Sequence, residues 1–260
     1  FDHFYGYPDF NAPKTNSWGT NDKNLFQALA DTLGNEQPTV HLIMTTSNHP
    51  PYNIDLAAEG FDLDKARQMV RELIPEAQDP DNLAVEIGHY WYMDKVVTQF
   101  VKDTMAKYPD SLFVIVGDHG DRYNIDKTPS TYERYGIPFI VTGQGIHKGT
   151  LLPDSAGSQI DIVPTIMELI APKGFSYMSL GSSLTTTNRR GVNYGFWITR
   201  TAIGKADTVP LEPESLTGSG SAPAIDETGM QDYINAIRSI SWWRAKYGPI
   251  LDASKLEGRK

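Results

Sequence analysis

The strongest constraint on the fold is a short apolar run near the middle of the chain, Leu112–Val116 (LFVIV). Both faces of a strand with this sequence are apolar, which is typical of a parallel sheet that helices cover on both sides. Two further runs, Thr39–Thr45 and Ile137–Thr142, are also β-branched and largely apolar. Helical patterns alternate with these runs. The alternation predicts an α/β fold with a doubly wound, mainly parallel sheet that has helices on both faces.

Five segments carry apolar residues at helical spacing. The spacing predicts helices over residues 23–33, 63–73, 83–107, 160–170 and 230–247. Asp22 and Asp161 are expected to cap the first and fourth helices, with Pro164 in the first turn of the fourth. The last helix is expected to dock on the body of the protein through one side, formed by Tyr233, Ile237, Ile240 and Trp243.

The last quarter of the chain differs in composition from the rest. Val192–Thr199 is predicted to be a strand, whereas Pro, Gly, Ser and acidic residues are frequent over residues 205–229. We therefore expect a body over residues 1–200, a surface excursion over residues 201–229, and a C-terminal helix and tail over residues 230–260.

Composition excludes several classes of function. The chain has 260 residues, enough for one α/β domain or one and a half. Its net charge is −9 and it has no run of Lys or Arg, so a nucleic-acid partner is not expected. The absence of Cys excludes disulfides, a CxxC zinc site and a thiol nucleophile. No apolar stretch approaches the roughly 18 residues of a membrane span.

The strand Leu112–Val116 leads directly into Gly117–Arg122 (GDHGDR). Ligands of α/β sheets bind beyond the carboxyl ends of the strands. Glycines on both sides of Asp118 and His119 permit a sharp bend, which could turn the carboxylate and the imidazole onto one metal ion. The alternative is a polar turn, in which Asp118 caps local amides and His119 is solvated.

Two other residues are candidates for a substrate site. His49 lies in a stiff, Pro-containing loop after Thr39–Thr45, where its imidazole could bind an anionic oxygen; the alternative is an exposed loop residue. Trp18 could form one wall of a pocket, or instead anchor the entry segment as a buried residue. No GxSxG, GxxxxGK[ST], HExxH or GxGxxG motif is present. Four more histidines are expected to be structural or exposed: His3, His41, His89 and His147.

Taken in order, these segments resemble the sulfatase-like branch of the alkaline phosphatase superfamily, and most of all its lipoteichoic acid synthase and phosphoglycerol transferase group. The resemblance covers about residues 1–185, through loose motifs in a specific order. These motifs are Trp18–Gly19, Asp22, Thr46–Pro50, Tyr92–Asp94, Gly117–Gly120, Ile137–Phe139 and Ile160–Thr165.

The resemblance implies an alkaline phosphatase-like fold with a divalent metal ion, Mn, Mg, Zn or Ca, at the strand tips. Asp118 and His119 match the metal ligands of the family. His49 matches the residue that contacts the phosphate head group, Trp18 matches a pocket wall, and Arg122 is a third candidate for substrate binding. In the family a metal-activated Thr or Ser attacks the phosphorus and forms a covalent phospho-enzyme intermediate.

The sequence departs from the family in one large respect. In the family the nucleophile and an acidic metal ligand lie upstream of every segment matched here. Residues 1–200 thus resemble the C-terminal part of a catalytic domain, with the N-terminal half missing. We expect this chain alone to bind metal weakly, to show no turnover and to self-associate. We expect the full-length protein to be an enzyme of phospholipid or glycan substrates, anchored in the membrane by upstream segments, in the periplasm or on the outer face of the cell membrane.

Two alternatives remain open from the sequence. A catalytically silent relative could keep the fold as a lipid-binding or regulatory module, although such a module needs neither Asp118 nor His119. A hydrolase of sulfate or phosphate esters would use water as the acceptor. The identity of the upstream nucleophile would distinguish these functions from transfer.

Overall fold

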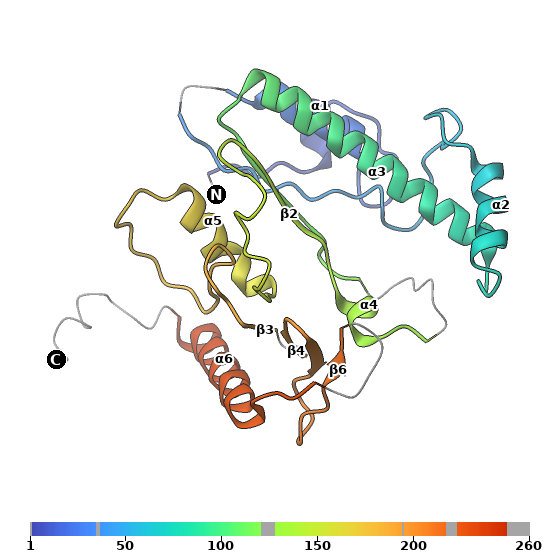
Figure 1. Ribbon diagram of the computed structural model, residues 1–260. Helices are drawn as coiled ribbons and strands as arrows, with labels where there is room; N and C mark the ends of the chain where they lie inside the picture. Colours follow the sequence, from blue (N-terminus) through green and yellow to red (C-terminus); the bar gives the residue numbers. More distant parts are fainter. Residues whose placement is uncertain (1, 35–36, 121–127, 194, 217–222, 249–260) are drawn as a thin grey trace. The chain divides into compact units, whose positions relative to one another are not determined.

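The computed structural model describes residues 2–34, 37–120, 128–193, 195–216 and 223–248 (Figure 1). The chain forms two compact units. Unit 1 comprises residues 1–129 and 137–146, and unit 2 comprises residues 130–136 and 147–260. Arg122, the third candidate for substrate binding, lies outside the described residues.

Three helices of unit 1 confirm the predictions from helical spacing. They are α1 (Asp22–Thr32), α2 (Leu63–Leu73) and α3 (Pro80–Lys107), and a short helix η1 (Tyr7–Asp9) precedes them. α1 and α2 both pack against α3. Side chains at three- and four-residue spacing on these helices, together with Leu56 from the segment between α1 and α2, make two core clusters. The clusters are Phe26, Leu56, Tyr92 and Val96, and Ala66, Val70 and Ala84.

The sheet of unit 1 corrects the prediction of parallel strands. β1 (Leu112–Val116) pairs antiparallel with β2 (Phe139–Gly143), with Leu112 opposite Gly143 and Val116 opposite Phe139. An apolar run specifies a strand with two apolar faces, but the direction of its partner is set by the connection, which the run does not encode.

The prediction of a strand over Thr39–Thr45 was wrong. Within the described parts of the chain no strand pairs with this segment, so it has no ladder of hydrogen bonds. Ile43 packs against the core cluster of Phe26 and Tyr92, whereas Val40, Leu42 and Met44 are exposed. Successive side chains of residues 39–45 point to opposite sides, as in an extended segment, but the side that carries Val40, Leu42 and Met44 is exposed to water.

Unit 2 combines a small antiparallel sheet with helices. The strands follow the order β3 (Arg190–Val192), β4 (Phe196–Thr199), β5 (Ala202–Lys205) and β6 (Glu214–Ser215). Of the strand expected over Val192–Thr199, β4 covers Phe196–Thr199, while Val192 is the last residue of β3, which pairs antiparallel with β4. The helices are α4 (Thr131–Tyr135), η2 (Gln159–Asp161), α5 (Ile162–Ile170) and α6 (Glu227–Tyr247).

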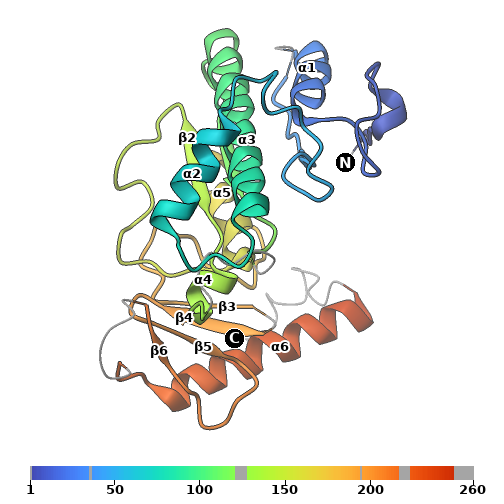
Figure 2. The same cartoon turned by 90° about the vertical axis from the view of Figure 1, so that its right-hand side faces the viewer.

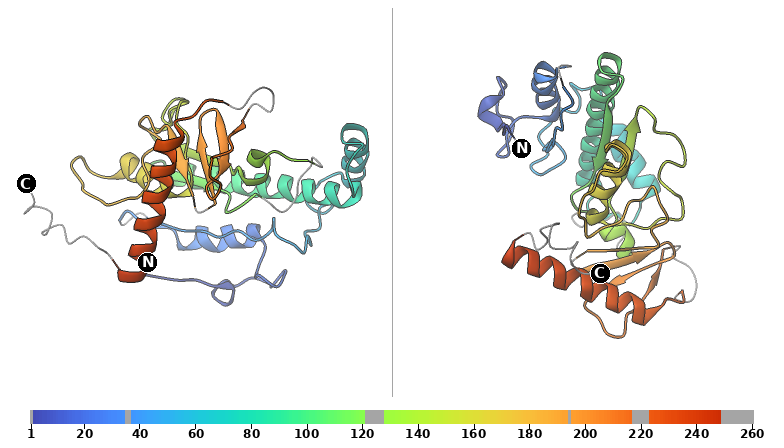
Figure 3. Two further views of the ribbon diagram at one scale, coloured as in Figure 1. Left: turned by 90° about the horizontal axis from the view of Figure 1, so that it is seen from below. Right: turned by 90° about the vertical axis from the view of Figure 1, so that its left-hand side faces the viewer.

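α6 packs against one face of the β3–β6 sheet (Figures 2 and 3). The core between them contains Val192, Trp197, Ala202, Ala206, Leu211, Met230, Ile234 and Ile237. Ala202, Ala206 and Leu211 lie in the range expected to be a surface excursion, so this part of residues 201–229 belongs to the fold. The prediction of which side of α6 docks was also wrong in part, since Ile240 and Trp243 are exposed.

Asp161 lies at the N-cap position of α5 but does not cap that helix through its side chain. Its carboxylate accepts hydrogen bonds from the backbone N–H groups of Ser158 and Ser182, both at 2.7 Å. Pro164 lies in the first turn of α5, as expected. None of the helices in the described ranges has the length and hydropathy that a membrane span requires.

Candidate functional site

The Asp118–His119 pair lies just beyond the end of β1, as the sequence predicts. Gly117 donates a backbone hydrogen bond to the carbonyl of Pro138, which fixes the strand end against the residue before β2. A Cβ atom at Gly117 would lie 3.3 Å from Pro138 Cδ, so glycine is what permits this close approach. The chain then turns, and the next two side chains project from the strand tip.

The two side chains converge. Asp118 Oδ2 lies 3.6 Å from His119 Nε2, and the backbone N–H of His119 donates to Asp118 Oδ1 at 2.9 Å. The Asp118 side chain is 90% exposed and the His119 side chain is 48% exposed. The carboxylate therefore combines features of both interpretations, because it accepts a local amide hydrogen bond while its other oxygen faces the imidazole.

This donor set fits a divalent cation only in part. A carboxylate oxygen and an imidazole nitrogen are common ligands of Zn²⁺ and of other divalent metals. Catalytic zinc sites take about three protein ligands. Within the described residues no group of three His, Asp or Glu side chains is placed to hold a metal ion. Within the described residues the pair therefore offers two side chains that could ligate a metal ion, without a third beside them.

Trp18 and His49 form a second pair. Their ring centroids lie 4.6 Å apart at an interplanar angle of 63°, an edge-to-face arrangement. Trp18 is 60% exposed, so it is not the buried anchor that was the alternative. Its position is set by a turn in which Asn16 Oδ1 accepts from the N–H groups of Trp18 and Gly19, and Gly19 has a φ of 144°.

The hydrogen bond of His49 determines what its other nitrogen can do. Nδ1 lies 2.7 Å from the carbonyl oxygen of Pro50, and because a carbonyl only accepts, Nδ1 carries the proton. Nε2 then donates to an anionic oxygen only when the imidazole is protonated. His89, in contrast, is fully buried: Nδ1–H donates to Val85 O, Nε2 accepts from Ile54 N–H, and burial lowers its pKa. The expectation that His89 is structural is confirmed.

Asp22 does not have the role of helix cap that the sequence predicts. Asn21, not Asp22, caps α1, since Asn21 Oδ1 accepts from Asn24 N–H at 2.9 Å. The fully buried Asp22 carboxylate instead accepts from the N–H groups of Thr46 and Ser47, at 2.8 and 3.1 Å. Asp22 N–H donates to Ser47 Oγ. The start of α1 therefore holds the loop that carries His49.

The pKa of the buried Asp22 carboxylate is also raised above its ordinary value. Burial raises the pKa of Asp22, and the hydrogen bonds from Thr46 and Ser47 oppose that shift. The sequence did contain one signal for this role: Asn21 and Asp22 are adjacent polar residues at a helix start, and only one of them can occupy the N-cap position.

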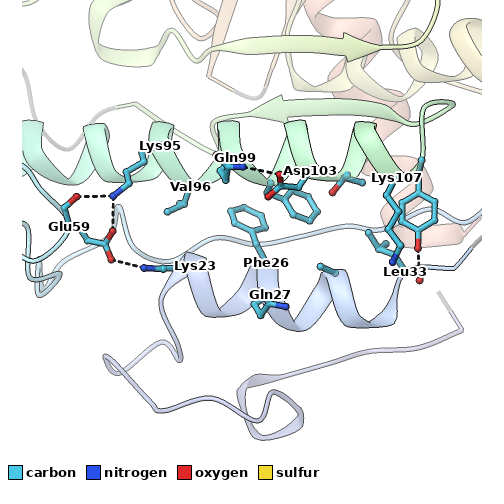
Figure 4. A pocket seen from close by; sticks show the side chains of 14 residues that line it. Lys23, Phe26, Gln27, Leu33, Glu59, Lys95, Val96, Gln99, Asp103 and Lys107 are labelled. Atoms are coloured by element: carbon cyan, nitrogen blue, oxygen red, sulfur yellow. Dashed lines mark hydrogen bonds and ion pairs between the residues drawn. The ribbon is translucent and has the colours of Figure 1, made fainter.

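A cavity of about 400 Å³ lies between α1 and α3, apart from both pairs (Figure 4). Its lining includes Phe26 and Phe100, whose rings stack at 4.6 Å, but none of Trp18, His49, Asp118 and His119. Glu59 accepts from Lys95 and Lys23 at one end, at 2.8 and 3.1 Å (Figure 4). The hydrogen bond from Lys95 is the main reason that the pKa of Glu59 is lowered. The charges at this end of the cavity, those of Lys23, Glu59 and Lys95, are paired within the protein.

Comparison with known proteins identifies the family to which the chain belongs. The family described as "Sulfatase" matches residues 1–171. A lipoteichoic acid synthase-like protein, YvgJ, of Bacillus subtilis is 26% identical over 212 residues, which cover 72% of this chain and 32% of that protein. The lipoteichoic acid synthase of Staphylococcus saprophyticus is 28% identical over 202 residues, 70% of this chain and 29% of that protein.

A solved structure supports the fold. The crystal structure of the lipoteichoic acid synthase LtaP from Listeria monocytogenes matches with a TM-score of 0.74 at 19% identity, over 96% of this chain and 65% of that chain. The predicted α/β class is thereby confirmed. This chain spans only about a third of the length of the relatives that it matches in sequence.

Proposed function

Because the chain belongs to the Sulfatase family, we propose that it forms part of a metal-dependent transferase of phosphoglycerol-type head groups. The names of its relatives, which are lipoteichoic acid synthases, support this substrate class. The observation that carries the proposal is the 3.6 Å approach of Asp118 Oδ2 to His119 Nε2 at the tip of β1. A silent module would need neither side chain.

In this proposal Asp118 and His119 hold a divalent ion together with ligands that the described residues do not provide. The bound ion supplies Lewis-acid polarisation of a phosphoryl oxygen. The imidazole of His49 binds a second oxygen of the same head group through Nε2, and the exposed indole of Trp18 shields that contact from water. Asp22 keeps the His49 loop in register with α1.

The hydroxyl that would attack the phosphorus and form the covalent phospho-enzyme belongs, by family resemblance, to an upstream part of the enzyme. No residue of this chain is assigned to that step. The substrate would be an envelope phospholipid or glycan on the extracytoplasmic side of the membrane. With water as acceptor, the same two ligands would instead serve ester hydrolysis.

The proposal is tested in the full-length protein by the release of glycerol phosphate from a lipid donor. Asp118→Asn and His119→Ala should each lower activity by about 100-fold or more, because even outer partners of metal ligands are worth roughly 10–100-fold. His49→Ala should raise KM for the lipid while the metal content stays unchanged.

His147→Ala is the matched control, because His147 is an exposed histidine whose hydrogen bonds are to its own loop. Retained activity in the Asp118 and His119 variants would refute the metal assignment. Activity confined to hydrolysis, with no acceptor product, would assign the site to an esterase.

A further inference from the structure

The C-terminal end of α6 carries three exposed aromatic rings, which we call the aromatic cluster: Trp242, Trp243 and Tyr247. Their exposed fractions are 61%, 39% and 59%. The ring centroids of Trp243 and Tyr247 lie 5.4 Å apart, and those of Trp242 and Tyr247 lie 6.2 Å apart. The rings thus contact one another and leave a large share of their area in water, which is unusual for indoles in a folded protein.

The two ends of α6 differ in what they contact. The N-terminal part buries Met230, Ile234 and Ile237 in the core of unit 2. The C-terminal end continues beyond the edge of the β3–β6 sheet (Figure 2). Packing within unit 2 therefore explains the first part of the helix but not the aromatic cluster.

Two basic residues, Arg244 and Lys246, lie in the last turn of α6, at the same end as the aromatic cluster. Lys246 Nζ lies 4.8 Å from the ring centroid of Trp242 and 5.1 Å from that of Tyr247. Arg244 lies in the same last turn, and residues 236–247 contain no Asp or Glu, although the whole chain has a net charge of −9. Positive charge and aromatic area are thus gathered at one end of one helix.

We infer that this end of α6 binds the surface of an anionic lipid membrane. Indole and phenol rings prefer the boundary between head groups and acyl chains, and Lys and Arg are attracted to anionic head groups. A second copy of this chain fits less well, because a symmetric contact through the cluster would bring Arg244 and Lys246 against their own copies. The inference goes beyond the proposed function and does not depend on the metal pair.

The test is co-sedimentation of the chain with vesicles of phosphatidylcholine, with and without phosphatidylglycerol. We expect binding to the anionic vesicles that weakens with salt, and a blue shift of tryptophan fluorescence on binding. Arg244→Gln with Lys246→Gln should weaken binding roughly 25-fold, since each basic side chain near an anionic surface is worth about 1 kcal/mol. Trp242→Ser with Trp243→Ser should abolish the blue shift and most of the binding.

Matched controls change exposed residues of the same kinds in loops of unit 2. Phe175→Ser controls for loss of an exposed ring, and Lys148→Gln with Lys173→Gln controls for loss of two positive charges. The inference fails if wild type does not bind, if both lipid compositions bind equally, or if the controls weaken binding as much as the cluster variants. It also fails if the tryptophan substitutions convert a dimer to a monomer without any effect on vesicles, because the cluster then joins two copies.

Discussion

At the scale of single residues, Asp22 shows how one carboxylate connects parts of the chain that are 24 and 25 residues apart. It is fully buried, Oδ1 accepts two backbone hydrogen bonds, and Oδ2 has no hydrogen-bond partner within the described structure. A buried carboxylate with this arrangement resists ionisation more than a solvated one, because charge is poorly stabilised away from water.

The raised pKa of Asp22 predicts a pH dependence of stability with a definite sign. The folded protein holds this proton more tightly than the unfolded chain does. The resulting stabilisation is complete below the ordinary aspartate pKa of about 3.9 and is lost as the pH rises through the raised pKa of the folded state. Asp22→Asn keeps an oxygen acceptor and removes the charge. The free energy of unfolding of Asp22→Asn should therefore increase relative to that of wild type as the pH rises through this interval.

Urea unfolding of both proteins at several pH values measures this difference. Asp31→Asn, at an exposed position of α1, controls for the loss of one aspartate from the same helix. A difference between Asp22→Asn and wild type that is constant over the interval would show that the hydrogen bonds from Thr46 and Ser47 cancel the effect of burial on the pKa of Asp22.

The site shows which residue roles sequence can predict. Asp118 and His119 are neighbours in the chain and follow a strongly apolar strand, so their convergence follows from local geometry alone. Trp18 and His49 meet because hydrogen bonds such as those of Asp22 and Thr20 join their segments, and no local pattern encodes that contact. The first pair could be predicted as a pair from the local sequence Leu112–Gly120, whereas predicting the second pair required the fold.

At the scale of elements, the helices were predictable because their signals are local. α2 covers the predicted residues 63–73, and α3 begins at Pro80, three residues before the predicted start; Asp62 and Asp79 cap these two helices. The strands were less predictable, since pairing depends on residues far away in the chain. On α6, the stripes Met230–Ile234–Ile237 and Tyr233–Ile237–Ile240 have equivalent helical spacing. Only the position of the β3–β6 sheet selects between them.

Gly88 in the middle of α3 gives a prediction at this scale. A Cβ at this position would lie 2.4 Å from Leu56 Cδ1 and 2.9 Å from Phe61 Cε1. Gly→Ala within a helix ordinarily stabilises by about 1 kcal/mol. Here we expect the reverse, with Gly88→Ala lowering the free energy of unfolding by roughly 1–3 kcal/mol, because the methyl group overpacks the core.

Urea unfolding of the variant decides the sign. Gly34→Ala is the matched control, since a Cβ at Gly34 meets no atom within 4 Å and its backbone is not left-handed. If both variants are equally stable or more stable than wild type, α3 does not pack against Leu56 and Phe61 as closely as described.

At the scale of the whole molecule, the segment over residues 39–45 presents an apolar face to water. Val40, Leu42 and Met44 are all exposed, Leu42 by 81%, and they alternate along an extended backbone. An unpaired extended segment with such a face is a template for association with another chain. We predict that the isolated chain self-associates with increasing concentration.

Sedimentation velocity over a range of concentrations measures this association. Leu42→Ser with Met44→Ser should shift the protein toward monomer, because these changes remove apolar area without touching the core. Met178→Ser, at an exposed loop position of unit 2, should leave the association unchanged. A wild-type chain that stays monomeric at every concentration would contradict the prediction.

The central claim is that Asp118 and His119 bind the same cation, and the most direct measurement is a titration of the chain with Mn²⁺, followed through the NMR signals of its six histidine rings. The account predicts saturable paramagnetic broadening of the His119 ring at Mn²⁺ concentrations that leave the rings of His89 and His147 sharp. It also predicts that Asp118→Asn removes this broadening. A His119 ring that stays sharp, or that broadens equally with and without the Asp118 carboxylate, would contradict the claim.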